Sequence, residues 1–412
     1  ATGAEMGLLP PSNQPHAPPS PLSPPSPPSP PSPPPPRLPP SPPQTRAMAV
    51  SPVARIAAQG RFLLFDVIFH EQLNKQRRAL MFYLDLAMRL KRTLVLPRAR
   101  LLRTRRPSEA RTYHGFSPEA EYARWGDLLD LGTLRRLHPV IDLDEYLQQH
   151  GPLALGEHRI VPHGNVRRDC SATSLDFNGL SDVQSASTRC EQGAQYQART
   201  FLTPAYASVK ALSWQQCVDQ TGPNVVRRLR PWVRFEQGVY DAAAAFVAKT
   251  FGTEPFVAIH WRRTDFLIAR RTQPGVLQSP AELMRHARAL MKEHGVTRVY
   301  LATDNTDDGE MALVNAGLKP TRLEPPAEAA ESLRARAVHA NVEIAICAMA
   351  DYFLGTQTSS FTLAITEERQ AVFGHAAATG AEMGLKDAPK IERSARQHGQ
   401  PHVAPTQLKD EL

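Results

Sequence analysis

The feature that most constrains the fold of this chain is an alternation of short apolar runs with segments of helical periodicity. Runs with the length and composition of buried strands occupy 62–67, 93–97, 139–141, 256–260, 298–302 and 352–355. Segments with apolar residues at a period near 3.6 occupy 72–92, 144–149, 239–250, 280–294, 338–350 and 361–369. A strand, a helix and a second strand in this order form a parallel pair joined by a right-handed crossover. The pattern therefore predicts an α/β fold with two Rossmann-like domains that face a cleft.

A proline-rich segment precedes this α/β region. Of the 39 prolines, 20 lie between Pro10 and Pro43, where Ser-Pro-Pro units repeat. Such a tract favours solvated polyproline II and cannot build a packed core. We therefore expect a disordered Pro/Ser-rich stem over 1–60, an N-terminal domain over 61–228, a C-terminal domain over 229–375 and a tail over 376–412. The stretch 150–221 is predicted to be irregular and polar.

Charge and hydropathy disfavour a nucleic-acid partner and a membrane-spanning segment. The formal net charge is +8, but the basic residues are spread along the chain and mixed with acidic ones. No aromatic stacking platform or finger spacing accompanies them, so we expect no nucleic-acid partner. No run of 18 apolar residues occurs, so no transmembrane segment is expected in this chain.

The cysteines and the last four residues indicate the compartment. None of the four cysteines forms a Cys-x-x-Cys pair, which disfavours zinc. Cys170 and Cys190 flank a polar stretch where a disulfide is plausible, the partner of Cys217 stays open, and Cys347 is predicted to be a buried free thiol. The chain ends in Lys-Asp-Glu-Leu at 409–412, the signal that the ER-retrieval receptor binds. We therefore expect the ER lumen, although no signal peptide is visible.

Four polar segments follow predicted strands, where ligands bind in open parallel sheets. They are His70-Glu71-Gln72-Leu73-Asn74, the segment 260–266, Thr303-Asp304 and the segment 355–362. Ser and Thr at a helix N-terminus can bind a phosphate through N–H and O–H groups. With Arg262 and Arg263, these segments predict a nucleotide diphosphate site.

The sequence resembles the GDP-fucose-dependent protein O-fucosyltransferases, and it is more similar to the type 2 branch, which acts on thrombospondin repeats, than to type 1. The residues that carry the resemblance are His260-Trp261-Arg262-Arg263-Thr264-Asp265-Phe266, Tyr300-Leu301-Ala302-Thr303-Asp304, Ile344-Ala345-Ile346-Cys347-Ala348, Tyr352-Phe353-Leu354-Gly355-Thr356, Ser359-Ser360-Phe361 and Thr366-Glu367-Glu368-Arg369. The resemblance covers about 61–374. It implies a GT-B architecture and inverting transfer of fucose from GDP-fucose to Ser or Thr hydroxyls of a secreted acceptor with disulfide-rich repeats, without a metal or other cofactor.

The resemblance also implies roles for individual residues. Glu71 matches the catalytic base and Arg262 matches the arginine that stabilises the leaving GDP. Glu343 falls where the family has an aspartate that accepts from guanine. The residues implied to bind GDP-fucose are His70, Gln72, Leu73, Asn74, His260, Trp261, Glu343, Ser360 and Phe361.

Each role has a competing structural interpretation. Glu71 could be an ordinary first-turn carboxylate, Arg262 a partner of Asp265, and Glu343 a partner of Arg263. His260 could be a core histidine, and Asp304 could support the nucleotide or cap the next helix. Asp142-Leu143-Asp144 fits a Mn²⁺-binding pattern, but an aspartate there is also a routine helix cap.

One departure from the family concerns Gln72. The family usually has glycine directly after the base, which lets the backbone approach the diphosphate, whereas Gln72 carries a Cβ. An inactive homologue that acts as an ER binding or quality-control protein is therefore an alternative. Another is a fucosyltransferase with a glycan or other acceptor.

Overall fold

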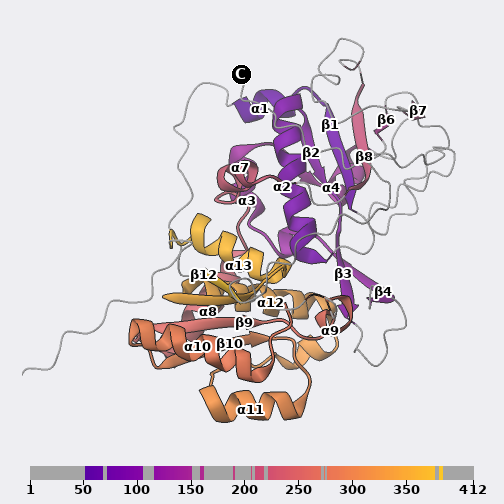
Figure 1. Ribbon diagram of the computed structural model, residues 1–412. Helices are drawn as coiled ribbons and strands as arrows, with labels where there is room; N and C mark the ends of the chain where they lie inside the picture. The colour runs from indigo at the N-terminus through magenta and orange to yellow at the C-terminus, as the bar shows by residue number, and fades with distance from the viewer. Residues whose placement is uncertain are drawn as a thin grey trace, which may run out of the picture. The chain divides into compact units, whose positions relative to one another are not determined.

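The computed structural model describes residues 52–67, 72–104, 116–150, 158–161, 189–190, 206, 209–217, 221–270, 273, 276–375 and 380–383. Most of them belong to two separate parallel sheets and the helices that cover these sheets (Figure 1). The predicted α/β alternation is thus present in both halves of the body.

Within the residues described, the first sheet contains six strands in the order β5-β2-β1-β8-β6-β7. Their bounds are β1 (Phe62–Val67), β2 (Thr93–Leu96), β5 (Val140–Asp142), β6 (His158–Val161), β7 (Arg189–Cys190) and β8 (Ala211–Cys217). Its strands pair in parallel; Leu63, for example, lies opposite Leu94 on one side and Leu212 on the other. A parallel central strand such as β1 is covered on both faces and can be apolar on both, as its first four residues, 62–65, are.

Successive residues of β1 pack on opposite faces of this sheet. Leu63 and Phe65 face α2 (Leu73–Leu90), whereas Phe62 and Leu64 face α4 (Leu143–His150). Figure 1 shows α2 running beside β1 and β2. Four further elements of this half are α1 (Pro52–Ala57), the antiparallel pair β3 (Ala99–Thr104) and β4 (Phe116–Ala123), and α3 (Leu131–Leu137).

The second sheet has the order β10-β9-β11-β12 and is also parallel. Its strands are β9 (Phe256–Trp261), β10 (Arg298–Thr303), β11 (Tyr352–Thr356) and β12 (Gly380–Met383). The helices of this half are α7 (Pro223–Leu229), α8 (Gln237–Thr250), α9 (Phe266–Ala269), α10 (Pro280–His294), α11 (Asp308–Leu318), α12 (Leu333–Met349) and α13 (Ser360–Ala371). Val257, Ile259 and Trp261 pack against α10 and α11, while Ala258 belongs to the opposite face with α8 and α12.

Local capping explains why some helix boundaries are predicted well. Ser279 and Glu282 form a reciprocal capping box at the start of α10, Pro280 occupies its first turn, and Gly295 ends it at φ 66°. The predicted helix over 280–294 is therefore confirmed at both ends. By contrast, α12 begins at Leu333 instead of 338, because Ser332 caps it one turn earlier.

The prediction of an irregular middle over 150–221 is wrong for three short segments. β6, β7 and β8 lie in this range, and β8 occupies the interior of the first sheet between β1 and β6. Its strand state depends on pairing with residues about 150 positions earlier, which no local pattern reports. Helix α1 likewise lies within the range assigned to the stem.

Two ion pairs link α2 and the residue after α7 to α13, and a hydrogen bond links α8 to it. Arg78 of α2 pairs with Glu367, and Arg230 pairs with Glu368, whose other oxygen accepts from the Tyr240 hydroxyl at 2.6 Å. The Arg230 and Glu368 side chains are both 0% exposed. A buried pair is expensive to break from one side, because the remaining charge stays desolvated.

We expect Glu368→Gln to lower the free energy of unfolding by about 3–5 kcal/mol, since Arg230 would keep a buried charge without its counter-ion. Chemical denaturation monitored by circular dichroism measures this loss. The matched control is Glu254→Gln, which removes an exposed partner of Arg298 and should cost less than about 1 kcal/mol. Equal losses in the two variants would contradict the prediction.

Candidate functional site

The carboxyl ends of β9 and β11 are joined by one buried hydroxyl. Thr356, at the end of β11, donates to the His260 carbonyl at 2.9 Å and accepts from the Arg262 N–H at 3.0 Å. Its side chain is fully buried. The main chain on either side of Trp261 is therefore held against the turn that leads into α13.

His260 is a neutral side chain packed against the start of α13. Its Nδ1 lies 2.7 Å from the Thr362 hydroxyl, and its ring stacks on Phe361 at 4.7 Å between centroids. Burial, and then the nearby Arg262, lower the pKa of His260 to about 3. It is thus uncharged near neutral pH and cannot act as a proton donor through an imidazolium.

The turn before α13 requires close packing of backbone against side chains. A Cβ on Gly355 would lie 2.4 Å from Thr362 Cγ2, so only glycine fits there. Ser359 caps α13 and accepts from the Phe361 N–H at 3.3 Å, while Ser360 opens the helix. The predicted arrangement of small hydroxyl residues at a helix N-terminus is present, and such an end favours a bound anion.

Arg262 lies between two carboxylates. Its Nε donates to Asp265 Oδ1 at 2.9 Å, and its Nη1 lies 3.2 Å from Asp304 Oδ2. Burial alone would lower the pKa of Arg262, but Asp304 and then Asp265 outweigh it and raise the pKa above its usual value. The predicted pairing with Asp265 exists, and it leaves part of the guanidinium available to a ligand.

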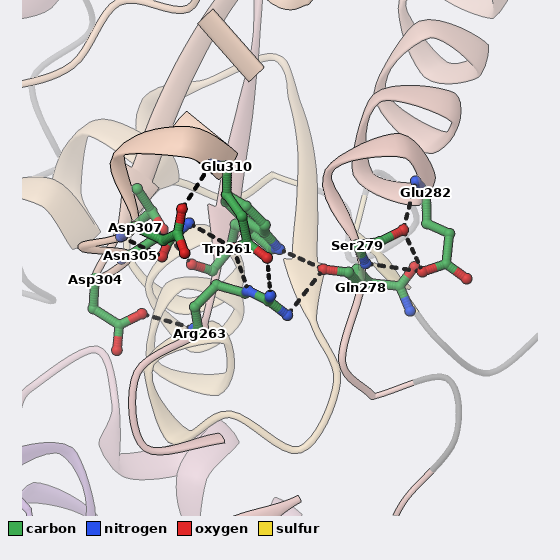
Figure 2. Close-up of polar contacts among 10 residues, drawn as sticks. Trp261, Arg263, Gln278, Ser279, Glu282, Asp304, Asn305, Asp307 and Glu310 are labelled. Atoms are coloured by element: carbon green, nitrogen blue, oxygen red, sulfur yellow. Dashed lines mark hydrogen bonds and ion pairs between the residues drawn. The ribbon is translucent and has the colours of Figure 1, made fainter. Parts of the chain in front are cut away.

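Arg263 has a different environment from its neighbour (Figure 2). Its guanidinium donates to both oxygens of Glu310, with Nε 2.9 Å from Oε2, and Nη1 reaches the Gln278 carbonyl at 3.4 Å. The expectation that both arginines face a diphosphate is therefore wrong for Arg263. Arg263 lies on the same side of the sheet as Trp261, since both donate to the Gln278 carbonyl, and its guanidinium points toward Glu310 of α11.

Asp304 does not cap the following helix. Asp307 performs that task by accepting the Glu310 N–H at 2.9 Å. Asp304 accepts the Arg263 N–H at 2.8 Å and the Thr264 hydroxyl, in addition to its ion pair with Arg262. Of the two interpretations left open from sequence, the cap is wrong.

Trp261 and Glu343 lie on opposite sides of β9. The Trp261 indole is fully buried against α10 and donates to the Gln278 carbonyl at 3.0 Å, so the indole is not accessible to a ligand (Figure 2). Burial raises the pKa of Glu343 to about 7, although Arg322 and Tyr300 oppose the shift and Asp304 adds to it. The partner of Arg263 is Glu310 and not Glu343.

The first polar segment is described only in part, because His70 and Glu71 lie outside the described residues. Gln72 precedes α2, and Leu73 and Asn74 form its first turn. Gln72 has φ −76° and ψ 163°, an extended conformation that any residue adopts. The glutamine therefore carries no backbone strain at this position.

Several residues of the site were not predicted individually. Thr356, Thr362 and Glu310 each hold a predicted residue in place. The cluster of hydroxyl residues over 355–362 was a signal for the first two, whereas Glu310 lies on a helix that the sequence pattern did not indicate. Cys347 is a buried free thiol, as predicted, whereas Cys170 lies outside the described residues.

Asp142 and Asp144 belong to no metal-binding group among the residues that the structure describes. Asp144 is paired with Arg98 at 2.6 Å. Among the residues that the structure describes, no group of three His, Cys, Asp or Glu side chains is placed to hold a metal ion. Within the same residues, no helix is both long and apolar enough to cross a bilayer.

Comparison with known proteins gives a consistent result. The family model of GDP-fucose protein O-fucosyltransferase matches residues 72–372. The chain is 34% identical over 369 residues to GDP-fucose protein O-fucosyltransferase 2 of Homo sapiens, with 76% of this chain and 84% of the human protein covered. The chain is 25% identical over 383 residues to GDP-fucose protein O-fucosyltransferase 2 of Caenorhabditis elegans, with 77% of this chain and 85% of the nematode protein covered.

A solved structure shares the fold. POFUT1 in complex with GDP superposes with a TM-score of 0.57 at 16% sequence identity, covering 79% of this chain and 99% of that one. POFUT1 in complex with GDP-fucose gives the same TM-score, with 80% and 99% covered. This likeness confirms the expected GT-B-like α/β fold.

The raised pKa of Glu343 predicts a pH dependence of stability. Folding favours the protonated form of Glu343. Its contribution to stability is therefore present below about pH 4.5 and falls as pH rises to about 7. Above that pH the ionised carboxylate destabilises the fold by the full amount. Glu343→Gln should therefore gain roughly 3 kcal/mol of unfolding free energy relative to the parent between pH 4.5 and pH 8. Urea denaturation across this range measures the gain, and parallel pH curves would contradict it.

Proposed function

Because the chain belongs to the GDP-fucose protein O-fucosyltransferase family, we propose that this glycosyltransferase moves fucose from GDP-fucose to Ser or Thr hydroxyls with inversion and without a metal. Its acceptors are secreted proteins with folded, disulfide-rich repeats of the thrombospondin type. The reaction takes place in the ER lumen, to which the ER-retrieval receptor returns the chain through residues 409–412.

One observation carries the donor side of this proposal. Arg262 lies at the carboxyl end of β9, and Thr356 ties its backbone to the turn that opens α13. A guanidinium and a helix N-terminus thus belong to one rigid unit. A diphosphate can bind to both, because the helix end supplies N–H groups and the arginine supplies charge.

The chemistry follows from these groups. The acceptor hydroxyl attacks the anomeric carbon of fucose from the face opposite the phosphate, and the carbon–oxygen bond to GDP breaks. Glu71, directly before the residue that caps α2, takes the hydroxyl proton as general base. Arg262 neutralises the charge that develops on the departing β-phosphate. No step needs a metal, because Arg262 supplies the positive charge.

The remaining predicted contacts recognise the nucleotide. Glu343, in its ionised form above about pH 7, accepts from the N1 and N2 donors of guanine. Ser360 and the Phe361 backbone bind phosphate, and the neutral ring of His260 packs beside them. His70, Gln72, Leu73 and Asn74 contact the sugar side of the donor.

The first test uses thermal shift with nucleotides. GDP at 100 times its Kd should stabilise the purified chain by about 2.7 kcal/mol, whereas UDP should not, because it lacks the guanine donors. Arg262→Ala should lose both the GDP shift and transfer. The control is Arg298→Ala, an exposed arginine at the opposite end of the sheet, which should keep both. Equal stabilisation by GDP and UDP, or substantial transfer by Arg262→Ala, would contradict the donor assignment.

The second test concerns the base and the acceptor. With a folded thrombospondin-type repeat, transfer should proceed in EDTA, and Glu71→Ala should reduce kcat by about 10²–10⁴-fold. The same variant should retain the GDP thermal shift, because Glu71 acts on the acceptor. Normal turnover by Glu71→Ala would reject its role as base. A parent chain that binds GDP but never turns over would instead favour the binding-protein alternative.

A further inference from the structure

Asp304 contacts Arg262 in a way that the proposed reaction does not use directly. An arginine has five N–H donors, one on Nε and two on each Nη. Asp265 takes the Nε–H at 2.9 Å, and Asp304 lies 3.2 Å from Nη1. Nη2 makes no hydrogen bond with any described residue. The two carboxylates therefore leave one particular edge of the guanidinium for a ligand.

The carboxylate of Asp304 is held more firmly than that of Asp265. Oδ1 of Asp304 accepts the Arg263 N–H at 2.8 Å, and Oδ2 accepts the Thr264 hydroxyl. Asp265 lies three residues after Arg262 and caps no helix through its side chain. Asp304 thus links the end of β10 to the end of β9, whereas Asp265 is a local partner.

The backbone on both sides of Asp304 is fixed as well. Thr303 donates to the Trp261 carbonyl at 2.6 Å and accepts the Asn305 N–H at 3.1 Å. Asn305 donates to Glu310, the same carboxylate that binds Arg263, at 2.9 Å (Figure 2). The buried Arg263 pair therefore acts as a scaffold that places Asp304 relative to β9.

This arrangement has an electrostatic cost. Arg262 carries one positive charge and its two partners carry two negative charges, so the site repels a diphosphate more than an unpaired arginine would. A carboxylate that opposes substrate binding needs another use. The use that the geometry offers is orientation, because the interactions of the guanidinium with phosphate are directional.

We propose that Asp304 is a positioning residue that fixes the Arg262 guanidinium so that its Nη2 edge meets the departing diphosphate. The inference rests on the proposed function of Arg262. It implies that Asp304 contributes to the transition state through Arg262 while weakening ground-state binding of GDP.

The test compares Asp304→Asn with the parent chain in GDP binding and in single-turnover transfer. Asp304→Asn should reduce kcat by about 10–100-fold through misplacement of Arg262, while the Kd for GDP stays equal or decreases. Asp351→Asn is the matched control, since Asp351 accepts the Phe256 N–H at 3.0 Å at the opposite end of β9. It should leave kcat unchanged.

A double-mutant cycle separates positioning from a general structural role. In the Arg262→Lys background, Asp304→Asn should reduce kcat by less than about threefold, because the group it positions is gone. The inference is wrong if Asp304→Asn lowers kcat by the same factor in the Arg262→Lys background as in the parent chain. It is also wrong if Asp304→Asn has no more effect on kcat than Asp351→Asn. In both cases the proposed function stands. If the parent chain binds no GDP, the inference and the proposed function are both wrong.

Discussion

The parallel register of β9 with β10 and β11 is the constraint on which the site depends. Parallel strands end on the same edge of a sheet, so residues about 40 and about 95 positions after β9 come to lie beside its end. Asp304 follows β10, Thr356 ends β11, and both contact the backbone or side chain of 262–263. Without this register, Arg262 would be an ordinary surface arginine with a local carboxylate three residues away.

Arginine has opposite uses in two adjacent positions. Arg263 is buried and has a structural role, because Glu310 and the Gln278 carbonyl accept its hydrogen bonds. Arg262 remains partly accessible, at 15% side-chain exposure, between two acidic partners. A charge that is already oriented can stabilise a developing negative charge without reorganising, which is the main advantage of a protein site over water. Asp304 joins the two arginines, because it accepts the Arg263 N–H and forms an ion pair with Arg262.

Burial sets the charge states of two further groups of the site. It keeps His260 neutral, so that its ring can pack on Phe361, and it makes Glu343 titrate near neutral pH. Both effects arise because desolvation disfavours the charged form. Arg262 therefore keeps its positive charge between the carboxylates of Asp265 and Asp304, while the neighbouring His260 ring adds no charge.

The sequence by itself determined the elements that local interactions stabilise. The capping box and αL glycine of α10, the apolar run of β1 and the hydroxyl-rich start of α13 are readable from neighbouring residues, and they suffice for the α/β class and the family. Only the tertiary structure decided that Arg263 pairs with Glu310 whereas Arg262 lies between Asp265 and Asp304, that Asp307 and not Asp304 caps α11, and that β8 lies inside the first sheet. These outcomes depend on pairing between residues far apart in the chain, and adjacent side chains of identical type carry no local signal of which direction they face.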